Sequence, residues 1–203
     1  STLIRKRHLK LPAYKAHTIM QTTFRLIICI CILLPGYLHA QVADYQFEPA
    51  FKTYSQLGNG AVLADDVSCT DDAEFNAINL PFTFTYCGVN YNTISVSVNG
   101  YITFGASTTN VTTDVLASLP NTIAVFAGDL YACASGHELS YVAYGVAPYR
   151  QFVVQWNNWG LQPAGTGEFN VQLRLYEGSN KIQLNYGNCS GATSTAMTVG
   201  VSG

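Results

Sequence analysis

The sequence predicts an all-β fold: an antiparallel sandwich of two sheets, jelly-roll-like or a meander, with about ten strands. Apolar residues alternate with polar ones over many short stretches, which is the period of a strand with one buried face. Turns that contain Gly or Asn separate these stretches. Charged residues make up only 11% of the chain and tyrosine is its commonest aromatic residue, a composition that favours strands.

The first forty residues have the pattern of an export signal. Met20 begins a short segment with one cation, an apolar run follows over 26–34, and Leu-His-Ala ends at Ala40. The apolar run is shorter than the roughly 20 residues that a membrane-spanning helix needs. We therefore predict a signal peptide at 20–40 and no membrane span after its cleavage.

The rest of the chain is expected to be one domain. Residues 1–19 precede Met20 without any periodic pattern, so we interpret them as an upstream extension of the reading frame. The β-sandwich domain is predicted at 41–203. Its last residues, 199–203, still have the pattern of a strand and its turn, and we expect the domain to be truncated there.

The first half of the domain is organised around a predicted hairpin at 92–104. Asn99 and Gly100 indicate a two-residue type I′ turn, which needs a positive φ at both central positions. Before this hairpin, the weak alternation over 41–57 predicts one or two edge strands. Residues 78–86 predict a strand with one apolar face.

The second half of the domain is more regular. Residues 121–127 are almost wholly apolar and predict a central strand. Further alternating stretches joined by short turns indicate an antiparallel meander, with strands at 139–144, 149–156, 168–176, 181–186 and 197–201.

Four segments of the domain occur in a familiar order: 96–105, 119–131, 144–159 and 171–187. This order resembles a β-sandwich module of large secreted or surface proteins of Gram-negative bacteria, often those with type IX sorting signals. It is also distantly similar to the extracellular domain of nidogen. The shared motifs form turns and core. The resemblance, over 47–203, therefore implies a non-catalytic module of an adhesin-like or multi-domain exported protein.

Four cysteines follow the predicted signal peptide: Cys69, Cys87, Cys133 and Cys189. An even number of cysteines in an exported domain predicts two disulfides, for which three pairings exist. We favour Cys69–Cys87, which flanks one strand and its loop, together with Cys133–Cys189, which ties two distant loops.

A loop around Cys69 is rich in carboxylates, namely Asp65, Asp66, Asp71, Asp72 and Glu74. Ca²⁺ binds six to eight oxygens from such side chains and from loop carbonyls. The spacing does not match an EF-hand, and a solvated acidic loop is the alternative interpretation. Asp129, at the end of an apolar strand, is interpreted as a turn or cap residue.

Aromatic side chains near the predicted strand at 149–156 suggest a surface for sugar rings. Trp159, Trp156 and Tyr149 are the candidates. Trp159 is expected beyond the strand and exposed, whereas Trp156 is the one more easily explained as core.

Catalytic motifs are missing from the sequence. His137 is the only histidine after Ala40, and neither a nucleophile elbow nor a zinc-protease motif is present. Glu168 and Glu177, two carboxylates that a glycosidase could use, lie at opposite ends of one predicted strand. We therefore expect no enzyme, and no cofactor other than the calcium considered above.

The charge of the domain limits its partners. Only four basic residues stand against all twelve acidic ones after Ala40, a net charge of −8, which excludes a basic stripe for nucleic acid. We expect a secreted or cell-surface structural or adhesive module within a larger protein. Its expected partners are other domains of the same polypeptide and an extracellular glycan or surface protein. The alternative is a carbohydrate-binding module that accompanies a catalytic domain elsewhere.

Overall fold

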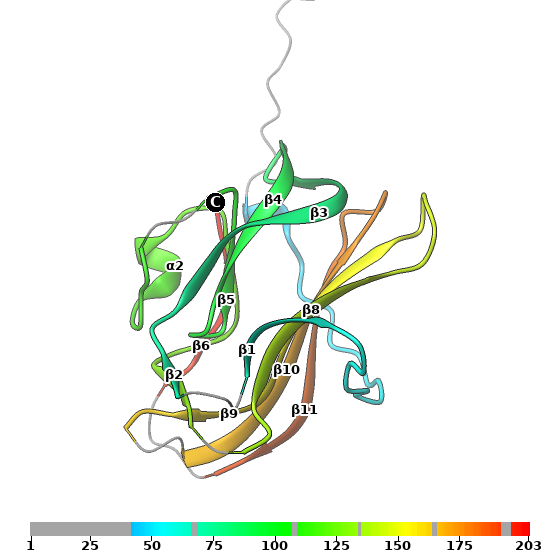
Figure 1. Cartoon of the computed structure of the whole chain (residues 1–203). Coiled ribbons are helices and arrows are strands. Elements are labelled where there is room, and N and C mark those ends of the chain that lie inside the picture. Colours follow the sequence, from blue (N-terminus) through cyan, green and yellow to red (C-terminus); the bar gives the residue numbers. More distant parts are fainter. Residues whose placement is uncertain (1–41, 66–68, 107–108, 134, 164–165, 192–195) are drawn as a thin grey trace, which may run out of the picture. The chain divides into compact units, whose positions relative to one another are not determined.

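The computed structural model describes residues 42–65, 69–106, 109–133, 135–163, 166–191 and 196–203 (Figure 1). Every described element belongs to one unit, His39–Gly203. The predicted upstream extension and signal peptide lie outside the described residues. No helix in the described part of the chain is long and apolar enough to cross a membrane.

Twelve strands in the described residues form two antiparallel sheets, which confirms the predicted fold class. The five-stranded sheet has the order β12-β6-β5-β4-β3, with bounds Thr198–Ser202, Thr122–Ala127, Tyr101–Phe104, Val89–Ser97 and Glu74–Tyr86. The seven-stranded sheet has the order β1-β8-β9-β10-β11, with bounds Ala61–Asp65, Glu138–Tyr144, Gln151–Leu161, Thr166–Tyr176 and Ile182–Ser190. At its side, β7 (Leu130–Ala132) pairs with β9, and β2 (Thr70–Asp71) pairs with β7.

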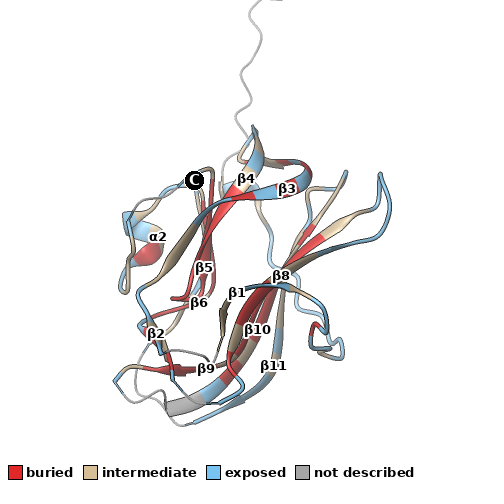
Figure 2. Cartoon of the chain, in the orientation of Figure 1, coloured by how far each residue is buried: buried red, intermediate tan, exposed pale blue. Residues whose placement is uncertain are grey.

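The core lies between the two sheets, where their inward faces are buried (Figure 2). Alternation along β3 and β10 buries the residues that the sequence pattern predicts: Leu80, Phe82, Phe84 and Tyr86 on β3, and Phe169, Val171, Leu173 and Leu175 on β10. The sheets also contact each other through specific groups. The indole Nε1 of Trp156 donates to the carbonyl of Ser97 at 3.0 Å, and the rings of Phe126 and Phe169 lie 4.8 Å apart.

The central hairpin has a different turn from the one predicted. Ser97 pairs with Tyr101, so three residues form the loop, and only Gly100 has a positive φ, of 78°. This is the three-residue hairpin with a left-handed last residue. A Cβ on Gly100 would lie 2.4 Å from the carbonyl oxygen of Phe126, which also explains why glycine is needed there. The side chain of Asn99 is buried rather than presented at the surface.

The segment before β1 contains a short 3₁₀ helix, η1 (Val42–Asp44), and no strand between Tyr45 and Gly60, so the predicted edge strands are wrong. Instead, the segment lies against side chains of β9 and β10. The backbone N–H of Leu57 donates to Oε1 of Gln155, and Nε2 of Gln172 donates to the carbonyl of Ser55, both at 2.8 Å. Polar side chains on the strands therefore supply the partners that strand pairing would have supplied.

The beginning and the end of the described domain meet beside β3. The ring of Tyr45 lies 5.5 Å from that of Tyr86, whose hydroxyl donates to the carbonyl of Ser202 at 2.8 Å. A Cβ built on Gly203 would lie 2.9 Å from Cγ2 of Val42. The first and last described residues are therefore neighbours.

Candidate functional site

The described cysteines form one disulfide, between Cys69 and Cys133, whose Cα atoms are 4.2 Å apart. The favoured pairings Cys69–Cys87 and Cys133–Cys189 are therefore wrong, and Cys87 and Cys189 are free thiols. The reason is a pairing between short strands distant in sequence. Thr70 of β2 is the register partner of Ala132 of β7, which places the two cysteines opposite each other just outside the ladder.

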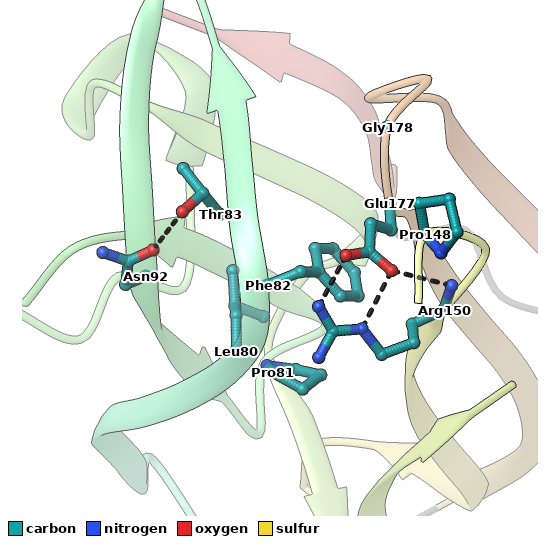
Figure 3. Close-up of a pocket in the computed structure, with 9 residues that line it drawn as sticks. All are labelled: Leu80, Pro81, Phe82, Thr83, Asn92, Pro148, Arg150, Glu177 and Gly178. Carbon is teal, nitrogen blue, oxygen red and sulfur yellow. Dashed lines mark hydrogen bonds and ion pairs between the residues drawn. The ribbon is translucent and has the colours of Figure 1, made fainter. Parts of the chain in front are cut away.

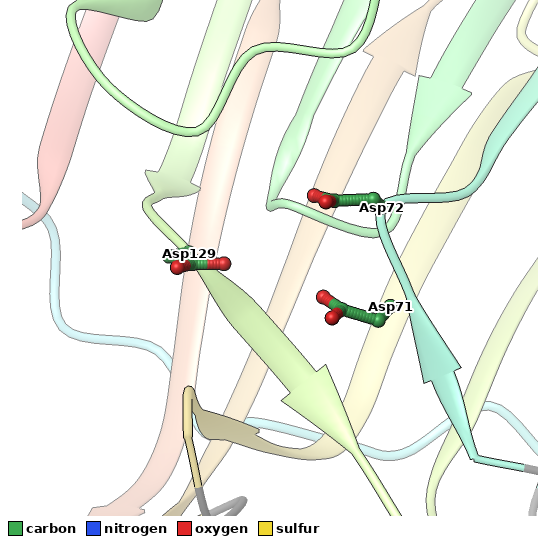
Figure 4. Close-up of side chains that lie close together, drawn as sticks. All are labelled: Asp71, Asp72 and Asp129. Carbon is green, nitrogen blue, oxygen red and sulfur yellow. The ribbon is translucent and has the colours of Figure 1, made fainter.

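Three carboxylates converge beside this disulfide. Asp71, at the end of β2, and Asp72, which follows it, meet Asp129 from the turn between β6 and β7 (Figure 4). One carboxylate oxygen of each lies within 4.8 Å of the others, and all three residues are exposed. This group could hold a hard cation such as Ca²⁺, with water completing the coordination.

The cluster differs from the predicted one in its members. Asp71 and Asp72 belong to both, whereas Asp129 was interpreted as a turn residue and is part of the group. Asp65 lies in β1, paired with Glu138, and Glu74 begins β3, so neither joins the group. Asp66 lies outside the described residues.

Amide side chains hold the cluster in place. Oδ1 of Asp72 accepts hydrogen bonds from Nδ2 of Asn99 at 3.0 Å and from Nδ2 of Asn110 at 2.7 Å. Asn99 also accepts the backbone N–H of Leu130, the residue after Asp129, at 2.8 Å. The buried asparagine of the central turn thus connects both acidic segments.

Electrostatics at the cluster favour the binding of positive charge. Partial burial raises the pKa of Asp129, and the negative charges of Asp71 and Asp72 raise it further. A cation between the three carboxylates would relieve this repulsion.

The two tryptophans are fully buried, so the expected exposure of Trp159 is wrong. The strand β9 extends past it to Leu161, with Asn158 at a positive φ of 57°. The register with β10 shifts at this point, so that Trp156 and Trp159, three positions apart, both face inward. A ring without exposed surface cannot stack on a sugar. Tyr149, in contrast, is 79% exposed in the turn between β8 and β9.

His137 is buried against Trp159, with ring centroids 5.7 Å apart in an edge-on arrangement. The indole Nε1 of Trp159 donates to the carbonyl of Glu138 at 3.2 Å. The histidine is thus packed into the fold next to a buried tryptophan.

A second feature, which the sequence did not indicate, is a pocket of about 610 Å³ between the turns of the seven-stranded sheet and β3 (Figure 3). Its lining includes the ion pair of Arg150 and Glu177. Nε and Nη2 of Arg150 donate to the carboxylate at 2.8 Å and 2.5 Å, and the backbone N–H of Arg150 adds a bond at 3.0 Å. These hydrogen bonds lower the pKa of Glu177 to about 2.

The model of the NIDO-related family matches residues 44–203, which is most of the chain. The chain belongs to this family. No curated protein and no solved structure matches the chain. The NIDO-related match confirms the distant resemblance to nidogen, and it covers both the acidic cluster and the pocket. Together with the disulfide, it indicates that the NIDO-related domain is an extracellular module.

Proposed function

We propose that this domain is a non-catalytic structural or adhesive module within a larger secreted or cell-surface protein. The observation that carries the proposal is the bond between Cys69 and Cys133 in a domain of the NIDO-related family. Disulfides persist in oxidising compartments and are rare in the cytosol. The bond joins Cys69 to Cys133, and all three residues of the acidic cluster lie in the segment that it closes.

The use of the reactive side chains supports a non-catalytic role. His137 is buried beside Trp159, and the hydrogen bonds of Asn99 and Gln155 are made to the domain's own backbone and side chains. Catalysis needs such groups at a site that substrate can reach. Here they stabilise the packing of loops on the two sheets.

The test is the location and redox state of the protein in the cells that make it. An antibody against the domain should label intact cells or the medium, and mass spectrometry should find the peptide of Cys69 linked to that of Cys133. Detection only after lysis, with both thiols free to alkylation, would contradict the proposal.

Calcium binding also stays a prediction, and its residues change. The group to test is Asp71, Asp72 and Asp129, which the fold brings together from segments distant in sequence. A bound calcium would then fasten the turn after β6 to the segment that leads into β3.

For the alternative role, carbohydrate binding, the two tryptophans are no longer candidate residues, whereas Tyr149 remains one. Because Trp156 and Trp159 have no exposed surface, a sugar would have to bind at another place on the domain. Tyr149 stands between Pro148 and Arg150, which both line the pocket.

A further inference from the structure

We propose that the pocket at Arg150 and Glu177 binds one residue of a neutral glycan, with Tyr149 as an aromatic platform at its rim. This inference rests on the adhesive role proposed above and names the ligand class.

One wall of the pocket is an irregular part of β3. Asn79 pairs with Thr93 and Phe84 with Tyr91, so residues 80–83 stand opposite Asn92 alone. Pro81, within this bulge, has no N–H for the ladder. Bulges are frequent beside binding sites, because they direct side chains away from the regular sheet. Here the bulge brings Leu80, Pro81, Phe82 and Thr83 into the lining.

The opposite wall comes from two turns of the other sheet. Pro148 lies in the turn between β8 and β9, and Gly178 lies in the turn between β10 and β11. The turns are joined, because the N–H of Glu177 donates to the carbonyl of Arg150 at 2.9 Å. The resulting volume of about 610 Å³ is within the range of small-molecule sites.

The charged residues in the lining of the pocket sum to zero. Arg150 and Glu177 neutralise each other, and the guanidinium also lies 5.7 Å from the centroid of the Phe82 ring. An anionic ligand would meet Glu177, and a cationic ligand would meet Arg150. A neutral ligand meets neither repulsion, and the domain's net charge of −8 further disfavours acidic glycans.

The free hydrogen-bonding capacity suits adjacent hydroxyl groups. Arg150 uses Nε and Nη2 for the ion pair. Among the described residues, no hydrogen bond engages the donors of Nη1. Asn92 accepts from Thr83 through Oδ1 at 2.8 Å, which leaves its amide donors. The carboxylate of Glu177 can accept further bonds. Vicinal hydroxyls both donate and accept, so they match the donors of Arg150 and the acceptors of Glu177, while Asn92 lies on the other side of β3 (Figure 3).

Apolar side chains at and near the pocket would pack against the C–H face of a sugar ring, while its hydroxyl groups make hydrogen bonds. Pro81 and Pro148 supply exposed carbon surface in the lining, where Leu80 and Phe82 are largely buried. Tyr149 is 79% exposed and Tyr144, on the same hairpin, is 42% exposed. We assign to the exposed ring of Tyr149, which stands between the lining residues Pro148 and Arg150 in the chain, the stacking role that the buried Trp159 cannot have.

The experiment is affinity electrophoresis and pull-down of the folded domain on cellulose, xylan, mannan and galactan, with polygalacturonate as the acidic probe. The variants are Tyr149→Ala and Arg150→Lys, which keeps the charge that faces Glu177 but removes the Nη1 donors. Phe51→Ala is the matched control, because Phe51 is a fully exposed aromatic outside the pocket. Melting temperatures verify that each variant folds.

We expect retention on at least one neutral polysaccharide, weaker by about three- to tenfold in each pocket variant and unchanged in Phe51→Ala. Three results would overturn the inference: no retention on any neutral probe, retention that Tyr149→Ala and Arg150→Lys leave intact, or a preference for polygalacturonate. If the domain is found outside the cell with its disulfide formed but binds no neutral probe, the pocket proposal fails while the proposed function stands.

Discussion

Removing the Cys69–Cys133 bond should destabilise the domain by about 4 kcal/mol. The change is the double substitution Cys69→Ser with Cys133→Ser. The two residues are 64 positions apart, and closing a loop of that length removes about 4 kcal/mol of chain entropy from the unfolded state. This figure is an upper value, because residual structure in the unfolded chain lowers the gain.

Urea unfolding of the oxidised protein measures this loss. With a slope of about 2 kcal/mol per molar urea, the midpoint should fall by about 2 M. The matched control is Cys87→Ser with Cys189→Ser, which removes two free thiols and should leave the midpoint within about 0.5 M of wild type. A midpoint unchanged in Cys69→Ser with Cys133→Ser, or four titratable thiols in denatured, unreduced protein, would refute the reasoning.

Three further predictions follow from the site and the central turn. Because Arg150 lowers the pKa of Glu177 from 4.5 to about 2, the ion pair stabilises the fold above pH 4.5 and is lost as the pH falls toward 2. The difference in melting temperature between wild type and Glu177→Gln should therefore shrink over that interval, and a constant difference would contradict it. Asp129→Asn should stabilise the calcium-free protein, because it relieves like-charge repulsion, and should abolish any rise in melting temperature on adding calcium. If neither calcium nor a chelator changes the melting temperature of the wild type, the prediction of a cation site is wrong. Gly100→Ala should destabilise the domain by at least about 1–2 kcal/mol in urea unfolding, since it combines a left-handed φ with a clash at Phe126, and a neutral effect would argue against this turn.

Strands with strict alternation could be predicted from the sequence because their signal is local. On β10, every second residue from Phe169 to Leu175 is apolar, and all four such residues face the core. The prediction failed at the end of β9, because the strand was expected to end at Trp156 and continues to Leu161. Asn158 in the left-handed region rotates the end of β9, so that Trp159 faces inward at a position where strict alternation would have turned it outward. The Asn157-Asn158 pair was the available signal, because asparagine tolerates this conformation.

The candidate sites were predicted less well because they depend on contacts between distant segments. Cys69 meets Cys133 only because β2 adds to β7, and strands of two and three residues are too short for a pattern. Asp129 joins Asp71 through the same contact. The pocket needs two turns and a bulge of the other sheet to come together.

The neighbouring positions of Val42 and Gly203 have a mechanical consequence. A polypeptide that continues on both sides of the domain would enter and leave at one corner, so the domain would project sideways from the chain. Tension along such a chain would pull at the corner where Tyr86 holds Ser202, and would peel β12 from β6 before it loaded the core. The pocket lies at the same end of the fold, because the N–H of Thr85, next to Tyr86, donates to Oδ1 of Asn180 in the β10–β11 turn at 2.9 Å. Tension on the chain would therefore act close to the wall of the pocket that β3 forms.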